Sequence, residues 1–379
     1  MYGVLLVCGG RTHQENYAPL FAADKLCKLI GVTDETLAPP ERLQWNQRFA
    51  RELGIPLLPD LDAALGRQDV QVASICAEPE RRGRIAVRVA RAGKHLYMDK
   101  PLAASADDAR KIVAAVQRAG VRSHMDTMVH TPWAGQARQT LASGRLGELR
   151  AIHCDLLFAK GKAGTAPLGR ARREKFPPQR FTFVDSKREL YTTGVYSLAL
   201  ISWLTNRRVR TVRAVTANYF FIEHARNDVE DFGVIVMGLD GGITATLTAG
   251  RIGWTSDPMG GPMRILLVGT RGSLLVDAYS PRLEIYSDEP PWTPPLINPG
   301  DPMGFWKSSQ AEVKTRTKQA YVLPAGAPTG PEIPNEVSYF LDCIDQNRES
   351  DLSAARAAEG IEVLMAAYQS AATGQVVRL

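Results

Sequence analysis

Short apolar strands alternate with helical segments through the first third of the chain, and this alternation limits the folds open to it. The strands that we expect lie at residues 3–7, 26–33, 57–58, 70–76, 95–98 and 121–125. Helices fit between them, and the clearest lie at residues 39–53, 80–92 and 107–119. We expect Gly93 to end the second of these in the left-handed conformation and Ser105 to cap the third. Strands that alternate with helices are typical of a parallel sheet with crossover helices on both faces. The sequence therefore predicts an α/β domain with a doubly wound parallel sheet over residues 1–122.

The pattern changes after the segment Ser143–Glu148, where longer strands follow one another. We expect these strands at residues 149–158, 209–221, 232–239, 243–249, 264–268 and 273–276. Tight turns such as Asp240–Gly242 separate neighbours, which indicates antiparallel pairing. The other elements that we expect are helices at 190–204, 335–344 and 352–372, a final strand at 376–379, and an irregular segment rich in proline and glycine at 290–334.

These elements predict a second domain over residues 123–379. We expect an α+β domain with a large, mostly antiparallel sheet that is open on one face. Packing of its C-terminal helices against the first domain is compatible with this prediction. A sheet that helices cover on one face only leaves the other face to be buried by another surface.

Composition excludes several classes of protein. Of the 379 residues, 45% are hydrophobic and 23% are charged, which is typical of a globular chain. The net charge of +6 is spread along the sequence, so we expect no nucleic-acid partner. No apolar run reaches the about 18 residues of a membrane span, and the first strand lacks the basic start of a signal peptide. Five widely spaced cysteines without a CxxC pair favour reduced thiols and a cytoplasmic location.

The stretch from Lys160 to Arg188 is the exception to this even distribution of charge. It holds nine lysine and arginine residues against Glu174 and Asp185. It is either a solvated loop or an electropositive rim that attracts an anionic substrate or contacts a neighbouring subunit.

Lys100 follows the apolar segment 95–98 and precedes Pro101. Proline cannot donate to a strand ladder, so it marks the end of the strand. Doubly wound proteins bind their ligands at the carboxyl ends of the strands. Lys100 is therefore a candidate site residue, and a surface lysine before a turn is the alternative.

The first strand-to-helix turn, from Cys8 to His13, stands where a dinucleotide-binding loop is expected. Such a loop needs glycine where the backbone approaches a pyrophosphate, and Gly9 and Gly10 lie there, although the first and third glycines of the usual fingerprint are missing. Asp34 ends the second strand, where a carboxylate accepts hydrogen bonds from ribose hydroxyls and repels a 2′-phosphate. Glu35 follows instead of an arginine. The sequence therefore favours NAD over NADP. An ordinary tight turn is the alternative to a dinucleotide-binding loop at residues 8–13.

Several short segments form a recognisable set; they lie at 92–95 with 99–103, 143–148, 193–196 with 203–205, 230–231, 241–245 and 371–374. Together they resemble one family of NAD(P)-dependent sugar oxidoreductases, the glucose-fructose oxidoreductase and inositol dehydrogenase group (Gfo/Idh/MocA). The first reads AGKH followed by DKPLA, with Asp99 for the family's usual glutamate. The turn 77–82 departs from the family's TPxxxH pattern. The resemblance runs essentially from end to end.

The resemblance implies an N-terminal NAD-binding Rossmann domain. It also implies hydride transfer between nicotinamide and a secondary hydroxyl of a sugar, polyol or glycoside. Lys100 is then the lysine beside the nicotinamide and the substrate hydroxyl, Tyr196 matches the family's usual histidine, and Thr192 matches its usual aspartate. Relatives commonly assemble through the open sheet face, which implies a homodimer or a homotetramer.

Thr192 and Tyr196 are four residues apart in an expected helix, so both project from one face. Removing a hydride from a secondary alcohol requires a base that takes the hydroxyl proton. We assign this proton transfer to Tyr196 and the polarisation of the same oxygen to Lys100, and the reverse assignment stays open. An aromatic residue that only anchors the helix is the alternative for Tyr196.

The complete site that we expect has a cofactor part and a substrate part. The cofactor part contains Gly9, Gly10, Arg11, Thr12, His13, Asp34, Ala77, Pro79, Lys100 and Pro101. The substrate part contains Lys100, His124, Asp126, His153, Thr192 and Tyr196. His124 with Asp126, and His153 with Asp155, alternate along strands, as ligands of a divalent metal can. We expect no metal, because polar side chains that line a sugar cleft explain the same pattern.

Two other functions stay open on this sequence. One is a catalytically silent protein that senses a nucleotide or binds a partner on the same fold. The other is a glycosidase that uses NAD for a transient oxidation. The partner that we expect is a small carbohydrate substrate, which can be neutral or anionic. We expect no membrane partner.

Overall fold

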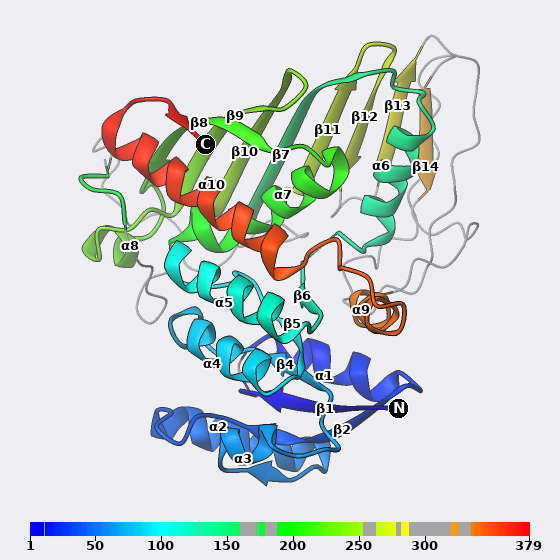
Figure 1. Ribbon diagram of the computed structural model, residues 1–379. Helices are drawn as coiled ribbons and strands as arrows, with labels where there is room; N and C mark the ends of the chain where they lie inside the picture. The colour runs from blue at the N-terminus through cyan, green and yellow to red at the C-terminus, as the bar shows by residue number, and fades with distance from the viewer. Residues whose placement is uncertain are drawn as a thin grey trace. The chain divides into compact units, whose positions relative to one another are not determined.

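The computed structural model describes residues 1–10, 12–127, 129–159, 172, 174–178, 188–252, 263–277, 282–287, 320–324 and 335–379. The described residues form two compact units (Figure 1). The first unit contains residues 1–127 and 335–361, and the second contains the described residues from 129 to 333 and those from 362 to 379. A C-terminal segment therefore belongs to the same unit as the N-terminal sheet.

The first unit is built on a six-stranded parallel sheet with the order β3-β2-β1-β4-β5-β6. Its strands are β1 (Tyr2–Val7), β2 (Cys27–Thr33), β3 (Leu57–Leu58), β4 (Val72–Ile75), β5 (His95–Met98) and β6 (Ser123–Met125). The direction of winding reverses between β1 and β4, and the carboxyl ends of strands at such a point are where these sheets bind ligands. The predicted doubly wound sheet is confirmed.

Side-chain caps open some helices of this unit, and glycines in the left-handed conformation follow others. The helices are α1 (Gln14–Ala23), α2 (Pro40–Leu53), α3 (Leu61–Leu65), α4 (Pro79–Arg91), α5 (Ala106–Ala119) and α9 (Glu336–Asp345). At the start of α5, the Ser105 hydroxyl accepts a hydrogen bond from the Asp108 backbone N–H at 3.1 Å. Gly93, after α4, has a φ of 70°, the left-handed conformation that glycine adopts most readily. The sequence predicted both features.

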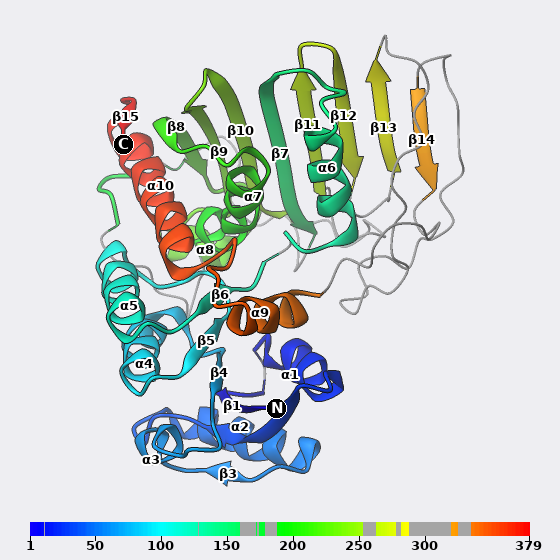
Figure 2. The same ribbon diagram turned by 45° about the vertical axis from the view of Figure 1, so that its right-hand side comes forward.

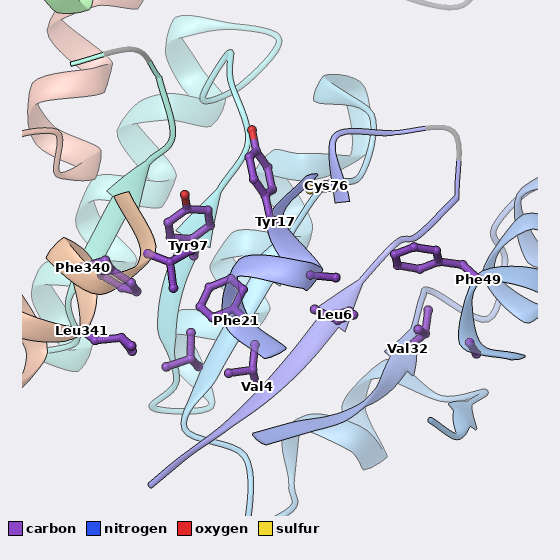
Figure 3. Packing of buried hydrophobic residues seen from close by; sticks show 14 residues of the cluster. Val4, Leu6, Tyr17, Phe21, Val32, Phe49, Cys76, Tyr97, Phe340 and Leu341 are labelled. Carbon is purple, nitrogen blue, oxygen red and sulfur yellow. The ribbon is translucent and has the colours of Figure 1, made fainter. Parts of the chain in front are cut away.

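The core of the first unit joins elements from both ends of the chain (Figure 3). Its buried side chains include Val4 and Leu6 of β1, Tyr17 and Phe21 of α1, Tyr97 of β5, and Phe340 and Leu341 of α9. The Tyr97 ring packs edge-on against Phe21 and Tyr17, with centroids 5.2 and 5.4 Å apart. The hydroxyls of Tyr17 and Tyr97 lie at the same end of this cluster, so apolar packing places two polar groups side by side.

The second unit is built on a nine-stranded sheet with the order β14-β13-β12-β11-β7-β10-β9-β8-β15. Its strands are β7 (Leu149–Ala159), β8 (Val209–Ala217), β9 (Phe232–Leu239), β10 (Ile243–Ile252), β11 (Met263–Gly269), β12 (Gly272–Asp277), β13 (Arg282–Ser287), β14 (Ala320–Pro324) and β15 (Val377–Arg378). β7 and β10 pair in parallel, and the other described pairs are antiparallel. The predicted mostly antiparallel sheet is confirmed.

Helices lie over one face of this sheet (Figure 2). They are α6 (Pro132–Ala142), α7 (Glu189–Thr205) and the part of α10 (Ala354–Thr373) that belongs to this unit; the short α8 (Ile222–Arg226) follows β8. A Cβ at Gly194 of α7 would lie 3.5 Å from Leu247 and 3.6 Å from Ala249 of β10, so helix and sheet are in close contact there. The Ser370 hydroxyl of α10 accepts a hydrogen bond from the Ala214 N–H at 3.1 Å.

The opposite face of the sheet carries exposed side chains. Along β9 the buried Ile235 and Met237 alternate with Val236, which is 44% exposed. On β8 the neighbouring Val215 is 64% exposed. An apolar pair at this exposure is unusual on a sheet face that stays in water.

Several elements of the second unit differ from the sequence prediction, and among them β13 and the short α8 were not predicted. β8 ends at Ala217 rather than at Phe221, because the buried Asp231 carboxylate accepts the N–H groups of the three residues after Asn218 at 2.8–2.9 Å and bends the chain. β14 lies inside the segment 290–334 that was expected to be irregular, and it pairs with β13. Helix α6 was not predicted, since its apolar spacing is weak.

We expect Asp231→Ala to destabilise the protein by about 3 kcal/mol or more. The substitution leaves several backbone N–H groups without an acceptor, and each buried donor left unpaired costs about 1–3 kcal/mol. Thermal unfolding measures the loss. The control is Asp240→Ala, which removes an exposed carboxylate paired with Arg210 and should leave the melting temperature nearly unchanged. Equal melting temperatures for the two variants would contradict the capping role of Asp231.

Candidate functional site

The turn that carries Lys100 lies at the carboxyl end of β5 in the first unit. The Asp99 N–H donates to the Ile75 carbonyl of β4 at 3.1 Å, which continues the sheet by one residue. Lys100 is half-buried, and the bond between Lys100 and Pro101 is cis. The lysine is therefore at the end of the sheet where the sequence placed it.

The Asp99 carboxylate is the centre of this turn. It is paired with His13 Nδ1 at 2.8 Å, the Tyr17 hydroxyl at 3.0 Å and a guanidinium nitrogen of Arg82 at 3.1 Å. Burial alone would raise the pKa of Asp99, but His13 and Arg82 hold it well below its usual value. Asp99 therefore stays charged and joins the first turn, α1 and α4 to Lys100.

The first turn has glycine where the neighbouring helix requires it. A Cβ at Gly9 would lie 2.4 Å from the Phe49 ring, and one at Gly10 would lie 2.8 Å from the Trp45 carbonyl oxygen. Gly10 has a φ of 70°, and Cys8 adopts the same region with a φ of 66°. The turn leaves backbone without side chains at the carboxyl end of β1, which fits the approach of a pyrophosphate.

Thr12 and the turn 77–79 play local roles at the predicted cofactor site. The Thr12 hydroxyl accepts the Gln14 N–H at 3.1 Å, and Thr12 N–H donates to Glu15 at 3.0 Å, so this segment opens α1. Pro79 is the first residue of α4, and the carbonyl of the buried Ala77 accepts a hydrogen bond from Arg82 at 3.0 Å. Arg11 lies outside the described residues.

Asp34 lies at the end of β2, as predicted, but its carboxylate already has partners. It is 3% exposed and accepts from the Arg81 guanidinium at 2.8 Å, the Asn46 amide at 2.9 Å and the Glu35 N–H at 2.8 Å. Ribose hydroxyls that bind to Asp34 must therefore replace one of these donors. The sequence analysis missed this role of Arg81, although the arginine-rich start of α4 was a visible signal.

Arg81 belongs to an ionic network around the first turn. It also donates to Glu78 at 2.7 Å, and Glu78 pairs with Arg42 at 2.5 Å. Arg42 in turn donates to the Gly10 carbonyl at 2.6 Å. Burial alone would raise the pKa of Glu78, but Arg81 and Arg42 hold it below its usual value. The network keeps three charged side chains paired close to the predicted cofactor turn.

A pocket of about 360 Å³ opens beside Gly10, among residues of α1 and α2. It is lined by Gly10, Glu15, Trp45, Arg48, Phe49 and Glu52. Glu52 pairs with Arg48 at 2.8 Å. Two carboxylates in the lining oppose the binding of a phosphate, so this pocket does not fit a pyrophosphate.

In the second unit, Thr192 and Tyr196 lie on α7, one turn apart as predicted. Thr192 is also one turn from Glu189, and its hydroxyl donates to the Glu189 carboxylate at 3.2 Å. Glu189 is buried and pairs with Arg251 at 3.1 Å and with His224 Nε2 at 3.3 Å. Glu189 therefore orders the start of the helix, a role that the sequence analysis did not assign.

Glu230 supports the same end of α7. It accepts from the Tyr368 hydroxyl at 2.5 Å, from Arg188 at 3.0 Å and from the Leu190 N–H at 3.3 Å. A carboxylate at the first turn of a helix is favourable, because it compensates unpaired N–H groups and the positive end of the helix dipole. Lys100 belongs to the first unit and Tyr196 to the second, so their joint action stays a prediction.

His124 was predicted to bind substrate, and the structure contradicts this. Its imidazole has no exposed surface, and its two nitrogens pair with Ser350 at 2.7 Å and Glu336 at 2.9 Å. Asp126 is also buried and pairs with the Tyr97 hydroxyl. Burial and the nearby Glu336 raise the pKa of Asp126. The alternation of polar residues along β6 therefore serves the contact with α9 rather than a cleft.

His153 cannot share a cleft with Thr192 and Tyr196. It pairs with the Thr246 hydroxyl at 2.6 Å on the sheet face opposite to the one that α7 covers. Alternation along β7 does not say which of its two faces the helices cover, which explains the error. Among the described residues there is no group of three or more His, Cys, Asp or Glu side chains arranged to hold a metal ion. No helix in the described part of the chain has both the length and the apolar character of a membrane span.

Two family models match the chain. Residues 3–127 match the oxidoreductase family with an NAD-binding Rossmann fold, and residues 135–275 match the GFO/IDH/MocA C-terminal domain. Together they cover most of the sequence. The chain belongs to the GFO/IDH/MocA family of oxidoreductases, and its first unit is an NAD-binding Rossmann domain.

Individual relatives are more distant. The chain is 28% identical over 257 residues to dTDP-3,4-didehydro-2,6-dideoxy-alpha-D-glucose 3-reductase of Streptomyces violaceoruber, which covers 66% of this chain and 67% of the relative. It is 26% identical to inositol 2-dehydrogenase of Salmonella typhimurium, over only 41% of each chain. An oxidoreductase from Agrobacterium radiobacter, solved in complex with NAD+, L-tartaric acid and magnesium, has a similar fold. Its TM-score is 0.73 and its identity 16%, over 100% of this chain and 98% of that one.

We expect His124→Gln to flatten the acid dependence of stability. Burial lowers the pKa of His124 to about 3, whereas an imidazole in the unfolded chain takes up a proton below about 6.5. Between these values the unfolded state binds more protons, so the stability of the unmodified protein falls as the pH falls from about 6.5 toward 3. Urea unfolding over this range measures the slope.

The control for this measurement is His153→Gln, which changes a histidine on the open sheet face. This variant should keep the slope of the unmodified protein. Parallel curves for His124→Gln and the unmodified protein would show that His124 is not buried as described.

Proposed function

We propose that this protein is an NAD-dependent oxidoreductase that transfers a hydride between nicotinamide and a secondary hydroxyl of a sugar, polyol or glycoside. The observation that carries the proposal is the Lys100 turn, a charged side chain held at the carboxyl ends of parallel strands in a Rossmann domain. The named relatives reduce or oxidise sugars and inositol, which supports the same class of substrate. All five cysteines are free thiols, which supports the cytoplasm as the location.

In this proposal each residue has one task. Gly9 and Gly10 hold the pyrophosphate against the backbone, and Asp34 takes the ribose hydroxyls. Bound NAD supplies the hydride acceptor. Tyr196, in the phenolate form that the Lys100 ammonium favours, takes the proton of the substrate hydroxyl as the carbonyl forms, and Lys100 polarises the same oxygen. The roles of Tyr196 and Lys100 can be exchanged without changing the products.

The contacts of Asp34 leave a second candidate, a catalytically silent protein that senses a nucleotide or binds a partner on the same fold. Arg81 and Asn46 occupy the carboxylate that the ribose needs, which weakens binding of NAD. The two candidates differ in one result. Only the enzyme forms NADH when a panel of sugars and polyols is offered with NAD.

We expect NAD to bind more tightly than NADP, because Asp34 repels a 2′-phosphate. Asp34→Ala should lower the ratio of the dissociation constant for NADP to that for NAD by about tenfold or more, which corresponds to about 1.4 kcal/mol. The substitution also releases Arg81, which then attracts the phosphate. Calorimetry with the unliganded protein measures both constants, and Glu41→Ala, an exposed acid on α2, is the control. Equal or tighter binding of NADP to the unmodified protein would contradict the assignment.

We expect Lys100→Ala and Tyr196→Phe each to lower kcat by about 10²-fold or more, the contribution of a positioned acid or base. The double variant should lose little more than either single one, because two residues that act on one oxygen form a unit. Lys100→Arg should also lower kcat, because the guanidinium is larger than the ammonium and stays charged. Affinity for NAD should change much less. If Tyr196→Phe keeps nearly full activity, Tyr196 only anchors the helix and the assigned proton transfer is wrong.

We further propose that two copies of the chain pair through the open face of the nine-stranded sheet, as a homodimer or within a homotetramer. Val236→Asp places a charge on that face, at β9, and should yield monomers in light scattering. Leu37→Asp, at a residue that is 97% exposed on the first unit, should not change the mass. A monomeric unmodified protein at micromolar concentration would refute the pairing.

A further inference from the structure

Arg82 is the most completely buried charged side chain of the turn 77–82. Its exposed fraction is 2%, and its guanidinium donates hydrogen bonds to oxygen atoms of Ala77, Asp99 and Pro101. Nε donates to the Ala77 carbonyl at 3.0 Å, and one terminal nitrogen donates to the Asp99 carbonyl at 2.7 Å and to the Pro101 carbonyl. The other terminal nitrogen pairs with the Asp99 carboxylate at 3.1 Å. Three of these four hydrogen bonds thus go to the turn 99–101, which carries Lys100.

We propose that Arg82 is a positioning residue for Lys100. This inference rests on the proposed function, because it assigns Arg82 a task in the same reaction. The carbonyls on both sides of Lys100, those of Asp99 and Pro101, bind the same guanidinium nitrogen. The backbone at Lys100 therefore cannot rotate without breaking both hydrogen bonds inside the protein, where an unpaired charge is costly.

A second set of contacts fixes this turn relative to the cofactor loop. The other oxygen of Asp99 binds His13 at 2.8 Å and the Tyr17 hydroxyl at 3.0 Å. His13 directly precedes α1, in the loop that begins with Gly9 and Gly10. Arg82, Asp99 and His13 therefore link Lys100 to the backbone that is expected to hold the pyrophosphate. Such a link sets the distance between the lysine and the nicotinamide.

Charge alone does not explain these contacts. Arginine presents five donors in a planar fork, whereas lysine presents three on a single atom. A lysine at position 82 keeps the positive charge beside Asp99 but cannot reach all four acceptors. A misplacement of about 1 Å at a reacting group costs about 10²-fold in rate. Arg82→Lys should therefore lower kcat between about 10- and 100-fold and change the KM for NAD by less than about threefold.

The matched control is Arg88→Lys, on the same helix. Arg88 pairs with Asp62 at 2.7 Å and with Glu35 at 3.4 Å, away from the Lys100 turn. This variant should keep kcat. Thermal unfolding of both variants shows whether either has lost its fold. If Arg82→Lys does not fold, Asp99→Asn takes its place, because an amide keeps the size of the side chain and loses the ion pair with Arg82.

A second readout does not depend on turnover. Lysines of the full chain are reductively methylated with a carbon-13 label, and the Lys100 signal is assigned through its loss in Lys100→Arg. We expect the signal to have its own chemical shift in the unmodified protein and in Arg88→Lys. In Arg82→Lys or Asp99→Asn it should move toward the shift of mobile surface lysines.

The two readouts separate the inference from the function on which it rests. A moved signal together with a reduced kcat supports the positioning role. A moved signal in a protein that oxidises no sugar supports the positioning role and refutes the proposed function. An unmoved Lys100 signal in folded Arg82→Lys overturns the inference, whatever the activity.

Discussion

The Asp99 carboxylate is the interaction on which the first unit's candidate site depends. A buried carboxylate is stable only when it is paired and hydrogen-bonded, and Asp99 receives donors from three separate elements. Removing any one donor leaves part of the charge uncompensated. The loop after β1, helix α1 and helix α4 are therefore tied to the residue that directly precedes Lys100. The apolar cluster of Tyr17, Phe21 and Tyr97 places the tyrosine hydroxyl for this contact (Figure 3).

A second ionic network competes with the cofactor instead of serving it. Asp34 is placed as a ribose-binding carboxylate, but Arg81 and Asn46 already bind both of its oxygens. A hydrogen bond to a charged group contributes about 1.5–3 kcal/mol, so exchanging one of these donors for a ribose hydroxyl gains little. Much of the affinity for NAD must then come from the pyrophosphate and the nicotinamide. This arrangement also keeps a guanidinium close to the ribose position.

The sequence predicted the elements that carry strong local signals. The parallel strands, the cap at Ser105, the left-handed Gly93 and the helix with Thr192 and Tyr196 all depend on periodicity or on one residue type. The errors concern tertiary contacts that leave no local pattern. His124 looked like a site residue because it alternates with Asp126, yet its partners Glu336 and Ser350 lie more than 200 residues away. The prediction for His153 was wrong because alternation along a strand does not say which face of the sheet the helices cover.

The arginines at positions 81 and 82 show the same limit. As a sequence they are two adjacent charges at the start of a helix, and nothing distinguishes them. In the structure Arg81 binds Asp34 and Glu78, whereas Arg82 turns to the Lys100 backbone. Successive residues of a helix point about 100° apart, so neighbours meet different partners. Which partner each one meets depends on how α4 packs on the sheet.

The central claim is that Lys100 is held in place before the cofactor binds, while Asp34 must change its partners. A crystal structure of the full chain with NAD tests both parts in one measurement. The account predicts ribose hydroxyls on Asp34 in place of Arg81 or Asn46, with the contacts of Arg82, His13 and Tyr17 to the Asp99 turn unchanged. NAD bound with the Asp99 turn rebuilt, or with Asp34 still bound by Arg81 and Asn46 and no contact to ribose, would contradict it.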